Sequence, residues 1–256
     1  GSAWMTEMRA GGERVEKRTE GRVKFKFYPG GVMGDDQAVL RKMKIGQLHG
    51  GALTAGSLTE AYPETQLYSL PLMFRNLNEV DAVRKHFDSQ MMDGIEKGGL
   101  VSFGFAEGGF AYIMSNAPLK SLSDVRKHKV WIPSNDPFAA DLVKSFNITP
   151  TPLPLSDVLV SLQSGLIDTV ATAPIGALAL QWHNQVKYLT ELPLLYVYAT
   201  FVIDKKIYGK LSALDQSIVR EEMSNVFKRL DEQNRKDNSA ALAALKKQGI
   251  QFVSLD

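Results

Sequence analysis

Two acidic side chains could do chemistry together, because Glu107 and Asp168 each follow an apolar stretch of the chain. A carboxylate pair that faces a cleft is the arrangement that hydrolyses glycosidic bonds. These are two of 28 acidic residues, so the indication is weak. The four His residues are scattered, without a partner at metal-ligand spacing, and the sequence has neither a Gly-x-Ser-x-Gly turn nor a phosphate-binding loop. We therefore expect a protein that is not an enzyme, with no catalytic residue, no metal and no cofactor.

Residues 152–174 hold the most informative local pattern. Ser156 predicts the start of a short helix, since its hydroxyl can accept from the first free N–H groups, and Gly165 predicts its left-handed end. Leu166-Ile167 then predicts a short apolar strand. Asp168 would lie near the carboxyl end of that strand, which is the end where ligands bind in open α/β sheets.

Helices and strands are predicted to alternate along the rest of the chain. Apolar periodicity and capping residues predict helices over residues 4–19, from Asp35 or Asp36 to Gly46, over 78–97 and 174–185, from Ser212, and with starts at Ser121 and at Asn135-Asp136-Pro137. Strands are predicted over residues 22–28, 100–105, 130–132 and 192–203. The longest helix is expected to break near Asn234–Asn238 and to continue over 240–247. This alternation indicates an α/β architecture with mostly parallel sheets.

The composition is that of an ordinary globular protein, with 256 residues, of which 44% are apolar. Thirty basic residues balance 28 acidic ones, so the charge gives no reason to expect nucleic acid or an anionic membrane as a partner. No run of 18 apolar residues occurs, which argues against direct membrane insertion. The absence of Cys excludes disulfides and thiolate chemistry.

Four segments, in order along nearly the whole chain, resemble the solute receptors of TRAP transporters (tripartite ATP-independent periplasmic transporters), the C4-dicarboxylate-binding-protein-like family. They are Tyr28–Asp35, Leu70–Phe74, Lys129–Pro133, and Ser161–Asp168 with Pro174. The resemblance implies a two-lobed, periplasmic-binding-protein-like α/β fold, with mixed, mostly parallel sheets flanked by helices and a long bracing C-terminal helix. It implies one lobe from residues 1–108 plus 199–240 and a second from 109–198 plus 241–256. The family normally opens with an apolar strand, which we expect to be absent from this numbering.

The resemblance also implies a function in transport. Such a receptor is periplasmic, binds a small organic solute in a cleft between hinged lobes, and delivers it to membrane permease subunits. The expected partners are therefore a small molecule and those subunits, with no nucleic acid and no membrane insertion. Two alternatives stay open on the sequence alone: a two-lobed ligand sensor for a membrane signalling protein, and a cleft enzyme of unknown reaction.

The sequence departs from its relatives at the expected ligand site. Many family members hold a substrate carboxylate with an Arg, whose planar guanidinium makes two parallel bonds to it. At the matching position this chain has Trp131, and the segment that often carries a second Arg is Gly109-Phe110-Ala111. Ala173 stands where an Asn commonly precedes the loop proline. The resemblance thus supports the fold and the transport role better than it supports a simple dicarboxylate ligand.

Aromatic side chains take the place of these polar anchors. The expected ligand-binding residues are Trp131, Phe110, Glu107, Tyr112, Asn135, Asp136, Phe138, Asp168, Thr172, Thr54 and Phe74. Three ligand classes remain open: an organic acid, a solute with an apolar or aromatic body stacked on these rings, and a cationic or zwitterionic solute opposite Glu107 or Asp168. The acid ranks first because the family's ligands are mostly organic acids. For Trp131, a place in the core is almost as well supported as a place in the cleft.

Overall fold

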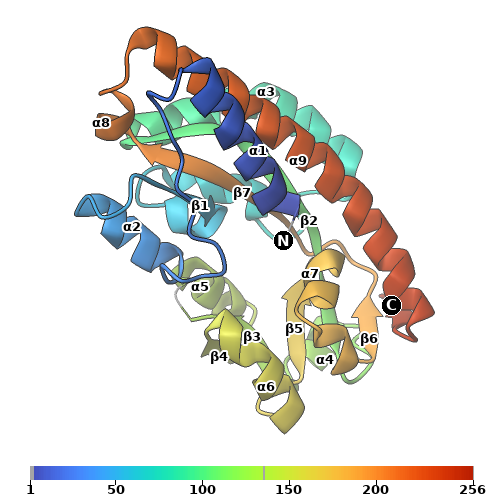
Figure 1. Ribbon diagram of the computed structural model, residues 1–256. Coiled ribbons are helices and arrows are strands. Elements are labelled where there is room, and N and C mark those ends of the chain that lie inside the picture. The colour runs from blue at the N-terminus through green and yellow to red at the C-terminus, as the bar shows by residue number, and fades with distance from the viewer. Residues whose placement is uncertain (1–2, 135, 256) are drawn as a thin grey trace. The chain divides into compact units, whose positions relative to one another are not determined.

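Strands and helices alternate along the chain in the computed structural model, which describes residues 3–134 and 136–255 (Figure 1). The chain forms two compact units. Unit 1 contains Gly1–Ser69, Leu77–Gly108 and Tyr198–Asn234, and unit 2 contains Leu70–Asn76, Gly109–Val197 and Arg235–Asp256. Three elements contribute residues to both units: β2 (Leu100–Ser115), β7 (Leu195–Asp204) and α9 (Ala213–Lys247).

Unit 1 is built on strands β1 and β7 and the first part of β2. Its other elements are α1 (Ala3–Arg18), α2 (Asp36–Lys44), β1 (Gly50–Thr54), the 3-10 turns η1 (Ala55–Leu58) and η2 (Pro63–Ser69), α3 (Leu77–Lys97) and α8 (Lys205–Tyr208). β1 pairs with β7 antiparallel, with Thr54 opposite Ala199. Val15, Phe103 and Phe227 belong to one buried cluster of this unit, which joins α1, β2 and α9. The core of unit 1 therefore lies between its strands and helices α1 and α9.

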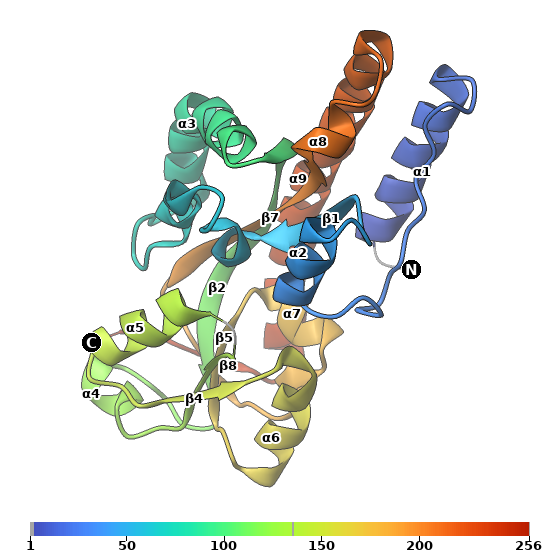
Figure 2. The same ribbon diagram turned by 90° about the vertical axis from the view of Figure 1, so that its left-hand side faces the viewer.

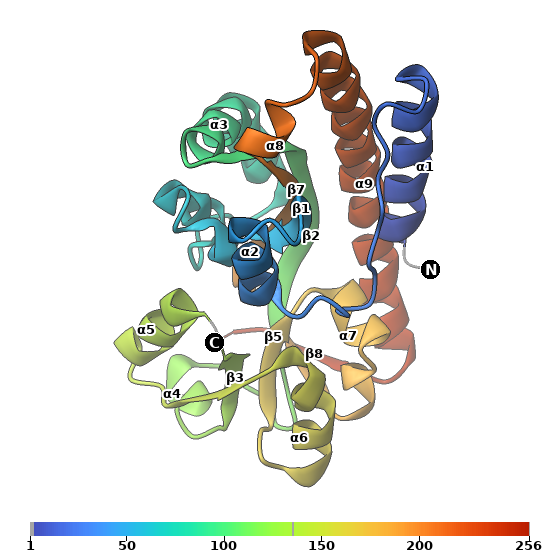
Figure 3. The same cartoon turned by 60° about the vertical axis from the view of Figure 1, so that its left-hand side comes forward.

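Helix α1 lies antiparallel along the first part of α9 (Figure 3). The contact is close because of Gly11: a Cβ on this residue would lie 2.4 Å from Cγ2 of Val226. Ion pairs line the same contact, since Arg14 and Arg18 both reach Glu222 at 2.8 Å, and Arg22 binds Asp215 with two nitrogens. Packing and charge thus act together on one helix pair.

Unit 2 contains the second part of β2 and most of the parallel strand pairs. Its elements are α4 (Leu122–Val125), β3 (Val130–Pro133), α5 (Pro137–Ser145), β4 (Pro150–Leu153), η3 (Leu155–Asp157), α6 (Val158–Ser164), β5 (Thr169–Thr172), α7 (Pro174–Ala179), η4 (Trp182–Asn184), β6 (Tyr188–Thr190) and β8 (Gln251–Val253). β3 pairs parallel with β4 and β5, and β6 pairs parallel with β8. β2 runs antiparallel to β5 and β6. The prediction of an α/β fold with a mixed sheet is confirmed.

Helices cover both faces of the unit 2 sheet, with α4 and α5 on one side and α6 and α7 on the other (Figure 2). The side of α6 and α7 buries the larger cluster, which includes Met114, Val170 and Leu162. The opposite face buries a smaller cluster around Leu119 and Ile148. Because helices cover both faces of this sheet, we expect a ligand at the ends of its strands.

Several predicted elements differ from the structure. Residues 22–28 form no strand: their alternating aromatic side chains are partly buried, but no ladder hydrogen bonds join them to a neighbour. Leu166-Ile167 is not a strand either, because β5 begins at Thr169. The helix expected over 174–185 ends at Ala179. The predicted break at Asn234–Asn238 is also wrong, since α9 is continuous through it.

Most predictions from capping residues are confirmed, but Ser156 does not cap α6, because its hydroxyl donates to Asp157 and the helix begins at Val158. Asp35 caps α2 by accepting from the N–H of Ala38, and Ser121 caps α4 in the same way. Gly165 ends α6 with a φ of 71°. No helix within residues 3–134 and 136–255 is long and apolar enough to cross a membrane.

Candidate functional site

Several of the predicted ligand-binding residues lie at one end of the strands of the unit 2 sheet, which we call the strand-end edge. β3, β4 and β5 are parallel, so their carboxyl ends meet at this edge, and β2 runs the other way and brings its early residues to it. Tyr112 of β2 pairs directly with Thr172, the last residue of β5. Directly opposed residues of an antiparallel pair have side chains on the same face. Burial raises the pKa of the Tyr112 hydroxyl, which therefore stays protonated near neutral pH.

Helix α5 begins beside this edge, directly after β3. Asp136 caps it, because one carboxylate oxygen accepts from the backbone N–H of Ala139 at 2.9 Å. Phe138 lies in its first turn and is half-buried. The Asp136 carboxylate thus already uses a donor that an anionic ligand would need. Asn135, which was predicted to belong here, lies outside the described residues.

Three aromatic rings form a row in unit 2, with Tyr196 in the middle. Its ring centroid is 6.0 Å from that of Phe74 and 5.8 Å from that of Phe110, both edge to face. All three rings are at least nine-tenths buried. The structure thus brings together two predicted residues through a third that sequence reasoning missed. Tyr196 could have been found from the pattern of alternate tyrosines within the predicted strand over 192–203.

Trp131 is packed into the core of unit 2. Only 8% of its surface is exposed, and its ring meets that of Trp182 edge to face at 5.3 Å. The indole N–H donates to the carbonyl of Leu153 at 3.0 Å, so its polar atom is already used. Most of this side chain therefore stabilises the fold. A ligand contact of its remaining surface stays a prediction.

Asp168 lies at the start of β5, so its predicted place at the carboxyl end of a strand is wrong. One carboxylate oxygen accepts from the N–H of Lys129 and from the hydroxyl of Thr169, each at 2.9 Å. The other lies 3.2 Å from Nδ1 of His128. The strand begins later than its apolar residues suggest, and Asp168 instead ties the loops at the opposite edge of the sheet.

Two predicted residues belong to unit 1. Glu107 of β2 is 1% exposed, and its backbone N–H and C=O are bonded to side chains of α9. Thr54 ends β1, where both its N–H and its hydroxyl donate to one oxygen of Asp36, at 2.9 and 2.7 Å. Thr54 is exposed and held in place by this double contact, whereas Glu107 is enclosed.

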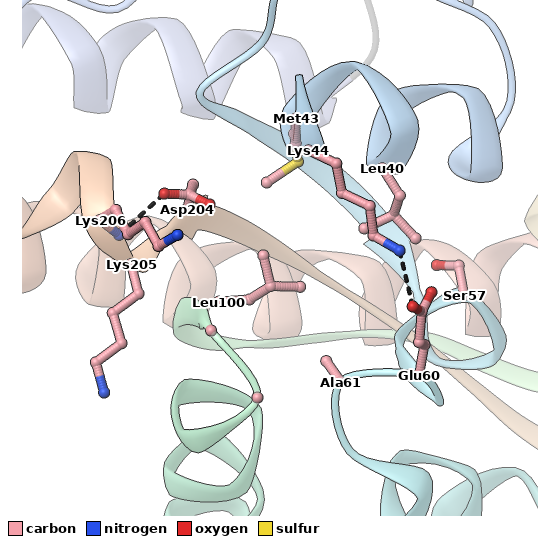
Figure 4. Close-up of a pocket in the computed structure, with 12 residues that line it drawn as sticks. Leu40, Met43, Lys44, Ser57, Glu60, Ala61, Leu100, Asp204, Lys205 and Lys206 are labelled. Carbon is pink, nitrogen blue, oxygen red and sulfur yellow. Dashed lines mark hydrogen bonds and ion pairs between the residues drawn. The ribbon is translucent and has the colours of Figure 1, made fainter. Parts of the chain in front are cut away.

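An open pocket of about 540 Å³ lies elsewhere in unit 1 (Figure 4). Leu40, Met43 and Leu100 supply apolar surface, and Lys44 and Glu60 point at one another across 2.7 Å. None of the predicted ligand-binding residues lines this pocket. Among residues 3–134 and 136–255, no group of three His, Asp or Glu side chains could hold a metal ion.

Comparison with known sequences gives a match over almost the whole chain. The family described as "Bacterial extracellular solute-binding protein, family 7" matches residues 3–256. A solute-binding protein of Verminephrobacter eiseniae is 28% identical over 208 residues, which are 80% of this chain and 61% of that protein. The sialic acid-binding periplasmic protein SiaP of Vibrio cholerae is 22% identical over 249 residues, 95% of this chain and 76% of that protein. The chain therefore spans only part of the length of these relatives.

Solved structures share the fold at low sequence identity. A TRAP periplasmic solute-binding protein of Xanthobacter autotrophicus, with bound β-D-galacturonate, has a TM-score of 0.91 at 19% identity, covering 99% of this chain and 85% of that one. One of Pseudomonas putida, with bound D-glucuronate, has a TM-score of 0.90 at 22% identity, covering 100% and 84%. At such identities the likeness shows the fold alone.

Proposed function

Because the chain belongs to the family 7 bacterial extracellular solute-binding proteins, we propose that it is a periplasmic receptor of a TRAP transporter. It binds a small organic acid reversibly and delivers it to membrane permease subunits, without chemical turnover. The family match over residues 3–256 carries this proposal, since it covers the segments that hold the predicted site.

An organic acid is the ligand class that the relatives favour. Among the structural neighbours, separate proteins carry β-D-galacturonate, D-glucuronate and D-erythronate, each of which has one carboxylate and several hydroxyl groups. Such ligands need donors for the carboxylate and polar groups for the hydroxyls. With Trp131 at the position where the family resemblance implies an Arg, the carboxylate would depend on backbone N–H groups and on neutral donors.

A receptor of this family is expected to close on its ligand by a hinge motion. Tyr112 and Thr172, which are paired at the strand-end edge of unit 2, are the polar groups offered from that side. Phe110 and Phe138 would form apolar walls there. Thr54 is the exposed polar residue that ends β1 in unit 1.

A thermal-shift screen against small solutes tests this function. A ligand that binds only the folded chain stabilises it by RT ln(1 + [L]/Kd), which is about 2.7 kcal/mol at a hundredfold excess over Kd. We expect hexuronates or aldonates to raise the melting temperature, and the matching neutral sugars and amino sugars to leave it unchanged. A shift with cationic or neutral solutes alone would contradict the acid proposal.

The Tyr112→Phe variant then tests the site. It keeps the ring and removes the hydroxyl, so we expect weaker binding of the acid with little change in melting temperature without ligand. Tyr188→Phe is a matched control, because Tyr188 begins β6 of the same unit and was not assigned to the site. Equal affinities in both variants would remove Tyr112 from the proposed site.

A further inference from the structure

A polar stripe interrupts the apolar face of α9. Up to Leu230 the inward positions of this helix are mainly apolar, including Met223 and Val226, and its buried acids Asp215 and Glu222 pair with arginines. Asp231, Asn234 and Asn238 then follow at a spacing that places them on one helix face. Asn234 and Asn238 are 9% and 8% exposed. A buried amide costs free energy unless it is hydrogen-bonded. The hydrogen-bond partners of these three side chains therefore indicate what the stripe does.

In unit 1 the stripe holds the backbone of one residue of β2. Asp231 accepts from the N–H of Glu107 at 2.7 Å, and Asn234 donates to its C=O at 2.9 Å. Both backbone polar groups of Glu107 are thus bonded to side chains of the helix. Because the two side chains lie almost one turn apart, they fix the strand along α9 as well as toward it.

Arg84 of α3 fixes the acid of this contact. Its guanidinium lies 2.8 and 2.9 Å from the two oxygens of Asp231, and it also donates to the carbonyl of Phe105 at 3.0 Å. A third bond reaches Asp88 at 3.1 Å. Arg84 is 9% exposed, and hydrogen bonds between charged groups at such sites are the strong ones. Three elements of unit 1 therefore meet at Glu107.

In unit 2 the next member of the stripe, Asn238, also lies against β2. Its side-chain oxygen accepts from the N–H of Ile175 at 3.3 Å, in the first turn of α7. A Cβ on Gly109 of β2 would lie 2.7 Å from its side-chain nitrogen, so this amide lies directly against the strand backbone. Gly109 has a φ of +91°, a conformation that other residues rarely adopt.

We propose that this stripe is a double grip that couples the bending of β2 to the bending of α9. Arg84, Asp231 and Asn234 hold the strand up to Glu107, and Asn238 holds it from Gly109 onward. Between these two sets of contacts lie Gly108 in the strand and residues 235–237 in the helix. A hinge motion would then bend both elements at one level.

The grip makes these side chains positioning residues for the ligand site, a consequence that rests on the proposed function. Phe110 and Tyr112 follow Gly109 by one and three residues, so their placement depends on where β2 bends. The grip itself needs no ligand and can be tested without one.

Distance measurements between two spin labels test the grip in the full chain without ligand. The absence of native Cys allows labels to be attached only at introduced positions. Ile45→Cys in unit 1 and Val160→Cys in unit 2 are suitable, because these residues are 71% and 64% exposed. In this background we compare N234A and N238A with N225A, which removes an exposed Asn from the same helix.

We expect N234A and N238A each to broaden the distribution of label distances at least twofold, because the strand and the helix can then bend at different levels. N225A should leave it unchanged. Distributions of unchanged width in N234A and N238A would overturn the proposal, as would equal broadening by N225A.

A milder variant covers the case in which N234A does not fold. D231N keeps an oxygen that can accept from Glu107 but removes the charge opposite Arg84. We expect the Glu107 amide to exchange its hydrogen at least tenfold faster in D231N than in the parent, while amides of α1 keep their rates. Unchanged exchange at Glu107 would overturn the grip. Since neither readout uses a ligand, a failed solute screen would count against the proposed function alone.

Discussion

Helix α9 is bound by arginines in two regions that differ in burial. Along its first half, Arg14, Arg18 and Arg22 reach acids of α9 from the side of α1, and each arginine side chain is 39–47% exposed. Further along, Arg84 reaches Asp231 from α3 with a side chain only 10% exposed. Solvent and salt screen the arginines of the first set, whereas Arg84 is largely shielded from water, although its acids Asp88 and Asp231 are 26% and 27% exposed. Similar ion pairs on one helix therefore have different consequences.

The pKa shifts of the acids that these arginines bind also differ between the two regions. The hydrogen bond from Arg22 holds the pKa of Asp215 below its usual range. For Glu222, burial acts to raise the pKa, but the hydrogen bonds from Arg18 and Arg14 outweigh it and the pKa is lowered. At Asp88, burial outweighs the attraction of Arg84 and raises the pKa. Asp215 and Glu222, which are 4% and 8% exposed but are each bonded to arginine, thus gain from ionisation on folding, whereas Asp88 loses.

The largest effect is expected from Arg84→Met. Removing one partner of a buried ion pair leaves charge without compensation, and we expect a loss of about 3–5 kcal/mol in the free energy of unfolding. Arg18→Met is the matched control, because it removes an exposed partner of α9, and we expect at most about 1 kcal/mol from typical surface pairs. Urea unfolding measures both. Equal losses would contradict the comparison.

The Gly11→Ala variant tests whether close packing, as well as charge, stabilises the contact of α1 with α9. In a helix interior this change normally stabilises by about 0.5–1 kcal/mol. Here the new methyl group would lie 2.4 Å from Val226, so we expect a loss of about 1–3 kcal/mol from overpacking. In a Val226→Ala background the same change should cost much less. A loss that does not depend on residue 226 would place the strain elsewhere.

The ion pairs of Asp215 and Glu222 with arginine predict a loss of stability in acid. Because the folded-state pKa values of Asp215 and Glu222 are lowered, their stabilisation is present above the ordinary values of 3.8 and 4.5 and disappears as the pH falls through the folded-state values. We expect D215N and E222Q to unfold more easily than the parent at pH 7, and the difference to shrink toward pH 3. Added salt should also reduce it. A difference that stays constant with pH would exclude this origin.

The smallest effect should come from Asp88→Asn, and its pH dependence should have the opposite sign. A carboxyl whose pKa is raised on folding disfavours the folded state when ionised, and this cost falls as the pH drops through the folded-state pKa. We therefore expect the parent to gain stability relative to D88N between pH 7 and pH 4. Parallel pH curves would show that burial does not dominate at Asp88.

Much of the local structure could be predicted from the sequence, because it depends on neighbouring residues. Asp35 and Ser121 cap their helices and Gly165 ends α6, as expected from side chains that bond backbone groups two or three residues away. The order of four motif segments indicated the family. In each case the physical cause lies within a few residues, so the sequence contains it.

The candidate site was harder to predict, because burial depends on residues distant in sequence. Trp131 matched an anchor position, yet the structure packs it against Trp182 and bonds its N–H to Leu153. Phe87 of α3 is apolar and yet 47% exposed, whereas the charged Arg84 of the same helix is buried. From the sequence alone an arginine is expected at the surface, and two of the partners that bury Arg84, Asp231 and the carbonyl of Phe105, lie on other elements.

The sequence by itself determined the α/β class, the capped helix starts and the family of this protein, since these follow from composition, period and short motifs. Only the tertiary structure decided whether residues 234–238 break the last helix or continue it. Taken alone, two Asn and an Asp favour a helix break, because their side chains compete for backbone bonds. In the fold, Asn234 and Asn238 bond or contact the backbone of other segments, so α9 stays continuous and gains its buried polar stripe.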